Sequence, residues 1–145
     1  MGVTDLCFIV DTTSSMTEYL ESFKHSIVEF NEIFGLCPLV NRIGVIEFKD
    51  YCCDYVCKFS GWKNSPSELF EFVNGLTADP NSDTPEASKT ALYELTQIIE
   101  NETLVILYTD AEPHSSISEQ HEENNKKELI QLNKCFDWIT LVNIL

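Results

Sequence analysis

The stretch from Val3 to Met16, VTDLCFIVDTTSSM, decides the fold of this chain. Within it, an unbroken apolar run, LCFIV, ends at Asp11 and is followed by hydroxyl residues from Thr12 to Ser15. A continuous apolar run bounded by polar residues predicts a strand that is buried on both faces of a parallel sheet. Ligands of open α/β sheets bind at the carboxyl ends of the strands. A carboxylate and several hydroxyls at such an end therefore predict a site for a small hard cation such as Mg²⁺.

Helix and strand patterns alternate after this stretch. Apolar residues at helical spacing predict a helix over Ser15–Phe34, which ends near Gly35. Arg42–Phe48, RIGVIEF, predicts a second strand. The link that follows is too short for a parallel crossover, so Tyr51–Ser60 is expected to return as an antiparallel strand.

The second half of the chain continues the alternation. Ser65–Glu68, SPSE, is a helix-start signal and predicts a short helix whose apolar part is Leu69–Leu76. A longer helix with an apolar stripe over Ala87–Ile99 is expected next. Thr103–Tyr108, TLVILY, predicts a second central strand that is followed, like the first, by a carboxylate, here Asp110.

The sequence pattern near the end of the chain indicates its secondary structure less clearly. The polar stretch 115–127 predicts a loop that passes into a helix, and the apolar residues of 138–145 recur at helical spacing, which favours a helix over a strand. Residues 1–145 are thus predicted to form a single α/β domain. Its fold class is a three-layer, Rossmann-like, open and mostly parallel sheet with one antiparallel edge strand and helices on both faces. With a helix at its end the sheet would lack its last strands, so the domain is expected to be truncated at the C-terminus.

Charge and composition exclude some classes of function. The chain has 9 basic and 24 acidic side chains and a formal net charge of −15. A strongly acidic domain repels phosphate backbones, which argues against nucleic acid as a partner, and it favours cations. The sequence has no apolar span long enough for a membrane helix, so no membrane insertion is expected. Because no export signal is visible, the six cysteines are expected to be reduced and the cytoplasm is favoured, while secretion stays open.

Three segments far apart in the chain carry a resemblance: VDTTSSM at 10–16, SDTPEA at 82–87 and VILYTDAEPH at 105–114. In this order they resemble the loops of the von Willebrand factor A domain, also found as the integrin I domain, with its metal-ion-dependent adhesion site. The resemblance is strongest to intracellular members attached to alpha-type protein kinases. It implies metal-dependent protein–protein recognition, in which an Asp or Glu of a partner completes the coordination of Mg²⁺, or of Mn²⁺ or Ca²⁺. No bond is made or broken in this function.

The resemblance also implies which residues hold the metal. The implied set is Asp11, Thr13, Ser15, Thr84 and Asp110. In the first loop the two hydroxyls would touch the ion, and the carboxylate would support it, often through water. Asp83 and Glu86 are rivals of Thr84 for the second loop, because D-T-P-E is similar to a version in which the glutamate reaches the metal. The chain is expected to be part of a larger protein or assembly.

Two alternatives stay open. Ser14 and Asn81-Ser82 replace glycines of many relatives and stiffen the loops, which keeps a metal-free scaffold with the same fold as one alternative. The other is a Mg²⁺-dependent phosphatase of the haloacid dehalogenase type, which also places an aspartate after its first strand. Its chemistry needs a second aspartate two residues later, where this chain has Thr13.

Overall fold

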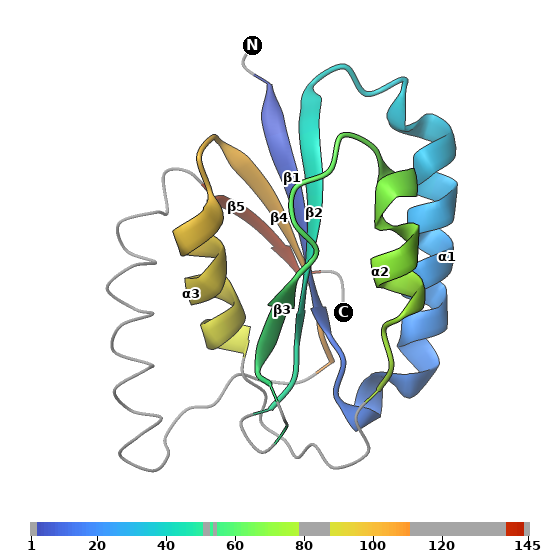
Figure 1. The fold of residues 1–145 in the computed structure, drawn as a ribbon, viewed down its shortest axis with the longest axis vertical. Coiled ribbons are helices and arrows are strands. Elements are labelled where there is room, and N and C mark those ends of the chain that lie inside the picture. Colours follow the sequence, from blue (N-terminus) through green and yellow to red (C-terminus); the bar gives the residue numbers. More distant parts are fainter. Residues whose placement is uncertain (1–2, 51–52, 54, 79–87, 111–138, 144–145) are drawn as a thin grey trace.

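The computed structural model describes residues 3–50, 53, 55–78, 88–110 and 139–143 of the chain (Figure 1). In this part, five strands form one sheet in the order β3-β2-β1-β4-β5. β1 is parallel to β2 and β4, β4 is parallel to β5, and β3 runs antiparallel to β2. The strands are β1 Thr4–Asp11, β2 Val40–Phe48, β3 Cys57–Phe59, β4 Thr103–Tyr108 and β5 Ile139–Asn143. The predicted open and mostly parallel sheet with one antiparallel edge strand is confirmed.

Helices cover both faces of this sheet. α1 and α2 lie on one face and α3 lies on the other (Figure 1). The helical segments are a 3-10 turn Ser14–Met16, α1 Thr17–Phe34, a 3-10 turn Pro66–Leu69, α2 Phe70–Asn74 and α3 Ser88–Ile98. All three predicted helices before the second central strand are therefore present, although the first two begin as 3-10 turns. No helix within the described ranges is long and apolar enough to cross a membrane.

The core lies on both sides of β1, the middle strand. Leu6 and Val10 face α1 and α2, while Cys7 and Ile9 face α3, because successive side chains of a strand point to opposite faces. All four side chains are buried, with at most 5% of their surface exposed. On the α1 side they pack with Leu20, Phe23, Ile27, Leu69 and Val73, and on the α3 side with Ala91, Leu95, Val105 and Leu107. The sequence prediction of a strand buried on both faces is confirmed.

The predicted helix at 138–145 is wrong. Ile139–Asn143 is a strand, β5, which pairs in parallel with Thr103–Leu107 of β4. The apolar pattern there is too short to separate a helix from a strand. The edge of β4 offers unpaired backbone N–H and C=O groups, which a strand can satisfy and a helix cannot. The tertiary environment therefore decided the structure of this segment.

Two other predicted elements are shorter than expected or fall outside the described residues. The antiparallel return strand is confirmed, but it covers only Cys57–Phe59 of the expected 51–60. The loop and helix expected over 115–132 lie outside the described residues. Among the cysteines with described side chains, Cys7, Cys37, Cys53 and Cys57, no disulfide is formed.

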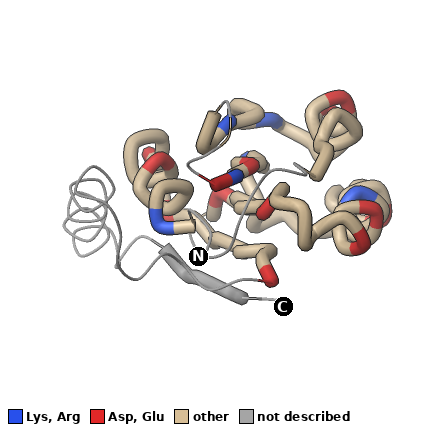
Figure 2. Tube along the Cα trace, turned by 90° about the horizontal axis from the view of Figure 1, so that it is seen from below, with Lys and Arg blue, Asp and Glu red and all other residues tan. Residues whose placement is uncertain are grey.

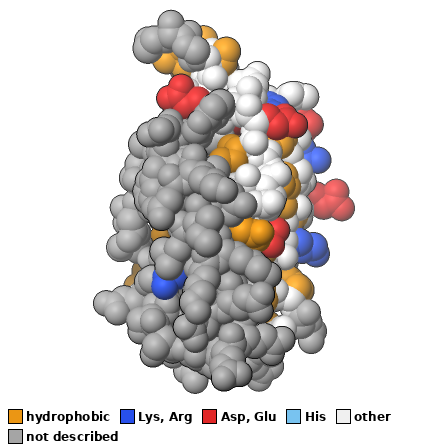
Figure 3. All heavy atoms as spheres, turned by 90° about the vertical axis from the view of Figure 1, so that its left-hand side faces the viewer, with side chains coloured by type: hydrophobic (Ala, Val, Ile, Leu, Met, Phe, Trp, Pro, Cys, Tyr) orange, Lys and Arg blue, Asp and Glu red, His pale blue; other side chains and the backbone are white. Residues whose placement is uncertain are grey.

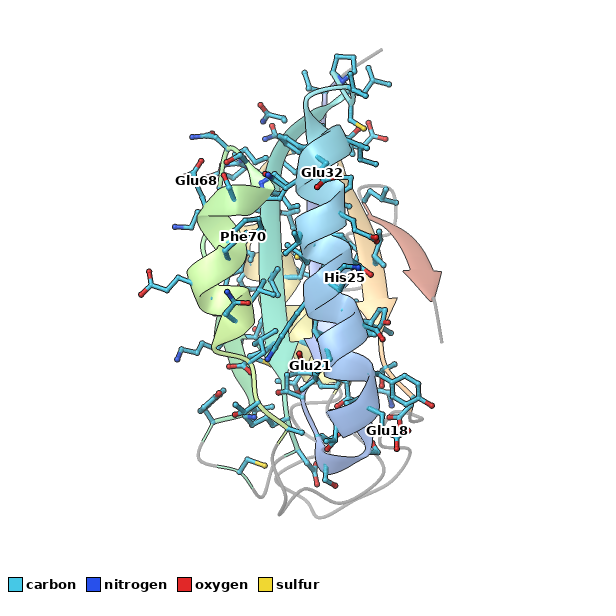
Figure 4. All side chains as sticks on the ribbon, turned by 90° about the vertical axis from the view of Figure 1, so that its right-hand side faces the viewer. Glu18, Glu21, His25, Glu32, Glu68 and Phe70 are labelled. Atoms are coloured by element: carbon cyan, nitrogen blue, oxygen red, sulfur yellow. The ribbon has the colours of Figure 1, made fainter. Side chains whose placement is uncertain are left out.

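The outer face of α1 is acidic. Glu18, Glu21 and Glu32 lie along this helix and point to solvent, and Glu68 extends from the 3-10 turn before α2 beside it (Figure 4). Part of the net charge is thus carried by a solvated helix face. On the α3 side of the molecule, described apolar, acidic and basic side chains lie interspersed on the visible surface (Figure 3).

The amino end of β1 holds a buried ion pair. The Asp5 carboxylate is fully buried and accepts an N–H of Arg42 at 2.6 Å, together with side-chain amide N–H groups of Asn41 and Asn101 at 3.1 Å each. Burial alone would raise the pKa of Asp5. The hydrogen bonds from Arg42 and the two amides, with the Arg42 charge, outweigh burial and hold this pKa below its ordinary value. The Arg42 guanidinium also lies 4.9 Å from the ring centroid of Trp62. At this end of the sheet the carboxylate is fully compensated.

Candidate cation site

The candidate site lies at the carboxyl ends of β1 and β4, at the other end of the sheet from Asp5. Figure 2 views the molecule from this end. Val10 of β1 is the neighbour of Tyr108 of β4, so the residues after each strand emerge side by side. Asp11, the last residue of β1, is the neighbour of Phe48 in β2. The parallel arrangement predicted from the sequence thus brings the first and third loops together.

Asp11 forms the buried floor of the site. One of its oxygens, Oδ1, accepts the backbone N–H of Thr13 at 2.9 Å and also the Thr13 hydroxyl. The other oxygen, Oδ2, accepts the hydroxyl of Thr109 at 2.7 Å. The Asp11 side chain is fully buried, and Thr13 and Thr109 are 1% and 5% exposed. The carboxylate is therefore held in one orientation by hydroxyl and amide donors.

Ser15 and Asp110 form the exposed rim. The Ser15 hydroxyl donates to Oδ1 of Asp110 at 2.9 Å, across 95 positions of sequence. The hydroxyl oxygens of Thr13 and Ser15 are 3.4 Å apart, which links the rim to the floor. Oxygen atoms therefore run continuously from a buried carboxylate to one that solvent can reach.

The electrostatics of the site differ from those of the Asp5 pair. Burial raises the pKa of Asp11, and the hydrogen bonds from Thr13 and Thr109 oppose this rise without cancelling it. The nearby charge of Asp110 raises the pKa of Asp11 further. Two carboxylates that repel each other in a partly buried site are a favourable place for a divalent cation, because the cation would remove the repulsion.

The oxygens at the site fit a hard cation. Carboxylates and hydroxyls are the donors that Mg²⁺, Mn²⁺ and Ca²⁺ accept, and Mg²⁺ keeps some of its waters. Among the described residues no group of three or more His, Cys, Asp or Glu side chains could hold a metal. The assembled set differs from such a group because it combines two carboxylates, Asp11 and Asp110, with two hydroxyls, Thr13 and Ser15.

Four of the predicted ligands are therefore together in space: Asp11, Thr13, Ser15 and Asp110. The predicted second-loop ligand, Thr84, and its rivals Asp83 and Glu86 lie outside the described residues, as do Asn81 and Ser82. Ser14 begins the 3-10 turn, and no non-glycine residue in the described part has a positive φ. The replacement of a glycine by Ser14 thus carries no left-handed backbone strain.

Thr109 is a site residue that sequence reasoning missed. Its hydroxyl orients the Asp11 carboxylate, whereas the sequence motif selects only the following residue, Asp110. A signal was present, since Thr109 is a hydroxyl residue directly after a buried strand, like Thr12 at the end of β1. The pairing of Val10 with Tyr108 would be needed to deduce that Thr109 lies beside Asp11.

The sheet order, the helices on both faces and the cluster at the carboxyl ends define an open α/β domain with a candidate cation site. A family profile for the von Willebrand factor type A domain matches residues 5–132. The chain belongs to the von Willebrand factor type A domain family. Domains of this family are in general protein-interaction modules, as expected from the sequence resemblance.

Two curated relatives match the sequence. The chain is 37% identical over 147 residues to an ariadne-like RING finger protein of Acanthamoeba polyphaga mimivirus, and this match covers 99% of the chain and 15% of the relative. It is 34% identical over 85 residues to alpha-protein kinase vwkA of Dictyostelium discoideum, with 57% of the chain and 14% of the relative covered. The second match agrees with the predicted likeness to domains attached to alpha-type kinases. The chain corresponds to a small part of each relative.

Solved structures share the fold at low sequence identity. The pilus adhesin SpaC from Lactobacillus rhamnosus GG has a TM-score of 0.61 at 17% identity, over 78% of this chain and 16% of the adhesin. The proximal thread matrix protein 1 of the mussel byssus has a TM-score of 0.64 at 16% identity, over 98% of this chain and 37% of that protein. These likenesses show the fold alone.

Proposed function

We propose that this chain is a divalent-cation-dependent protein-recognition domain. Asp11, Thr13, Ser15 and Asp110 would hold the cation, with one residue of the second loop, Thr84 or its rivals Asp83 and Glu86. Mg²⁺ is the proposed ion, and Mn²⁺ or Ca²⁺ could take its place. An Asp or Glu side chain of a partner protein would complete the coordination.

The observation that carries this proposal is the contact between Ser15 and Asp110 at 2.9 Å. These residues come from two loops that are far apart in sequence, and the family resemblance assigns both of them to the site. An ordinary helix cap would involve only the first loop and would not require a hydrogen bond from that loop to Asp110. The convergence of both loops on one set of oxygens favours a shared ligand.

The gradient of burial supports the recognition role. Asp11 and Thr13 are buried, whereas Ser15 and Asp110 are exposed. A bound Mg²⁺ would supply an open coordination position and positive charge, because two of its proposed ligands are neutral hydroxyls. The exposed rim gives a carboxylate of a partner access to that position.

We also propose that the domain makes and breaks no bond itself. The two curated relatives are named as a RING finger protein and a protein kinase, and the matched part is 15% and 14% of them. A short domain within long proteins is consistent with a recognition part beside other parts. A cytoplasmic location is proposed because part of the chain matches an alpha-protein kinase of Dictyostelium discoideum.

The test is a titration with MnCl₂ alone, followed by thermal unfolding. The wild-type chain should gain about 2.7 kcal/mol of stability at one hundred times the dissociation constant. Asp11→Asn should show no such gain, because it removes a charge from the site. Asp5→Asn is the matched control, since it makes the same change at the other end of β1 and should keep the response. An equal response of wild type and Asp11→Asn would reject the metal site.

A separate measurement tests whether a carboxylate of a partner binds to the ion. Mn²⁺ in the loaded protein speeds the relaxation of water protons through the waters bound to it. A short peptide with one glutamate should displace such a water and lower the relaxation rate, and the same peptide with glutamine should not. Equal effects of both peptides would contradict carboxylate recognition.

One alternative is favoured by a specific observation. Both oxygens of Asp11 already accept hydrogen bonds from Thr13 and Thr109, so the carboxylate is satisfied within the fold. A metal-free scaffold that recognises its partner by surface contacts would have this arrangement as well. The Mn²⁺ titration separates the two functions.

A further inference from the structure

A second buried polar cluster lies next to the candidate site. The Thr12 hydroxyl donates to Oε2 of Glu47 at 3.1 Å, and the Lys49 ammonium donates to the Thr12 hydroxyl oxygen at 3.2 Å. The Tyr55 hydroxyl donates to Oε1 of Glu47 at 2.6 Å, and Lys49 also donates to the carbonyl oxygen of Thr77 at 3.2 Å. The cluster thus joins the first loop to the end of β2 and to the segment that follows α2.

The burial of this cluster is not explained by the stability of the fold. Thr12, Glu47 and Lys49 are 0%, 4% and 5% exposed. Burying a carboxylate and an ammonium has a large desolvation cost, and apolar residues of similar volume are often as stable or more stable in such places. Glu47 and Lys49, which both contact the Thr12 hydroxyl, are therefore expected to have a role that apolar residues could not perform.

The geometry indicates what that role is. Glu47 and Lys49 lie on the α1 side of the sheet by the alternation of β2, and Thr12 lies on this side by the alternation of β1. Asp11 and Thr13 point the other way, because the backbone at Thr13 is extended, with φ −77° and ψ 168°. Fixing the Thr12 side chain therefore fixes the two peptide groups that set the positions of Asp11 and Thr13.

Lys49 also determines where the Thr12 proton goes. A hydroxyl has a single proton to donate, and the ammonium occupies a lone pair of its oxygen. The Thr12 proton must then point to the Glu47 carboxylate or to the Phe48 carbonyl oxygen, which is 3.2 Å away. Both acceptors belong to β2, so the first loop is held against that strand.

We infer that Lys49, with Glu47, is a positioning residue that holds Thr12, and through it the first loop, in the arrangement that the cation site needs. This inference rests on the proposed function. Partners that orient the direct ligands of a metal typically change its affinity about 10-fold to 100-fold when they are removed. Lys49 would thus act on the site without touching the ion.

Replacement of Lys49 by Met tests the inference, because the loss of positioning and the loss of charge should change the cation affinity in opposite directions. Removing a positive charge near a cation site should strengthen cation binding if charge alone matters. If Lys49 positions the loop, Lys49→Met should instead weaken the affinity for Mn²⁺ alone by about tenfold. Lys58→Met is the matched control, because Lys58 and Lys49 lie 5.6 Å and 5.5 Å from the same Tyr55 ring. Lys58→Met should leave the affinity unchanged or slightly stronger.

A second measurement needs no metal. Hydrogen exchange of the Thr12 and Thr13 backbone amides in chelator should be about tenfold faster in Lys49→Met and unchanged in Lys58→Met, since local opening sets exchange rates. If Lys49→Met does not fold, Thr12→Val takes its place. Thr12→Ser is its control, because serine keeps the hydroxyl.

The outcomes of the two measurements are distinct. Weaker Mn²⁺ binding and faster loop exchange in Lys49→Met support the inference, and unchanged or tighter binding with unchanged exchange overturns it. If wild type does not bind Mn²⁺, the proposed function fails, and the exchange rates alone decide whether Lys49 holds the loop. Unchanged exchange then overturns the inference as well.

Discussion

Asp5 and Asp11 are two buried carboxylates at opposite ends of the same strand, and their surroundings differ. Asp5 is neutralised by Arg42 and two amides, and its pKa is lowered. Asp11 is surrounded by hydroxyls and lies near a second carboxylate, and its pKa is raised. The amino end of β1 is thus complete within the chain, whereas the carboxyl end keeps an excess of negative charge that a cation can match. The difference is what we expect if the amino end of β1 serves stability and the carboxyl end serves the proposed cation binding.

The largest loss of stability is expected when the ion pair between Arg42 and Asp5 is broken. Arg42→Met should lower the free energy of unfolding by roughly 3 kcal/mol, because it leaves the Asp5 carboxylate buried without its charged partner. Urea unfolding measures this change. Lys24→Met is the control, since it breaks the more exposed pair between Lys24 and Glu21 and should change stability by less than about 0.5 kcal/mol. Equal effects would mean that the Asp5 pair contributes no more than a surface pair.

The same substitution at both ends should have unequal effects in metal-free protein. Asp5→Asn should lower the free energy of unfolding by about 2 kcal/mol, since it removes charge-assisted hydrogen bonds. Asp11→Asn should change it by less than about 1 kcal/mol, because the amide oxygen can still accept from Thr13 and its NH₂ group can donate to Thr109. Urea unfolding in chelator measures both. A larger loss for Asp11→Asn would contradict the assignment of the two ends.

The two ends should also respond to pH with opposite sign. The lowered pKa of Asp5 gives stability that is present above its ordinary pKa of 3.8 and is lost as pH falls through the lowered value. The raised pKa of Asp11 gives stability that is full below 3.8 and is lost as pH rises through the raised value. In chelator, the stability of Asp11→Asn relative to wild type should therefore increase as pH rises. The stability of Asp5→Asn relative to wild type should increase as pH falls. Urea unfolding across the acidic range checks both slopes, and slopes of the same sign would contradict the prediction.

The smallest effect on stability is expected at the exposed rim. Ser15→Ala should change the free energy of unfolding by less than about 0.5 kcal/mol, because Ser15 is exposed. It should nevertheless abolish or strongly reduce the stabilisation by Mn²⁺. Ser14→Ala, at the exposed neighbouring residue, should keep that stabilisation. Thermal unfolding with and without MnCl₂ measures both variants, and a full response in Ser15→Ala would remove Ser15 from the set of ligands.

The fold class could be predicted because local patterns agree with it. The apolar runs of β1 and β4, each followed by a carboxylate, predict central parallel strands, and the short link after Phe48 predicts the antiparallel edge. The pattern at 138–145 failed, since a short apolar segment takes the structure that its neighbours offer. There the free edge of β4, a feature of the folded sheet, favoured the strand β5.

The candidate site was predictable in part for the same reason. Asp11, Thr13, Ser15 and Asp110 could be selected because the segments that follow the two central strands resemble the metal-binding loops of the family. The contacts that orient Asp11 and Thr12 come from Thr109, Glu47 and Lys49, whose positions depend on strand register. No local pattern contains that information.

The sequence by itself determined that a buried strand would end in a carboxylate and hydroxyls, because an apolar run and the polar residues that follow it are local properties of the chain. The tertiary structure alone decided how the two carboxylates of that strand are compensated. Asp5 meets Arg42 and Asp11 meets Thr109 only when separate strands pair in register, and the low-dielectric interior then makes these contacts strong. Pairing across the sheet thus turned one acidic residue into a structural ion pair and left the other available for a cation.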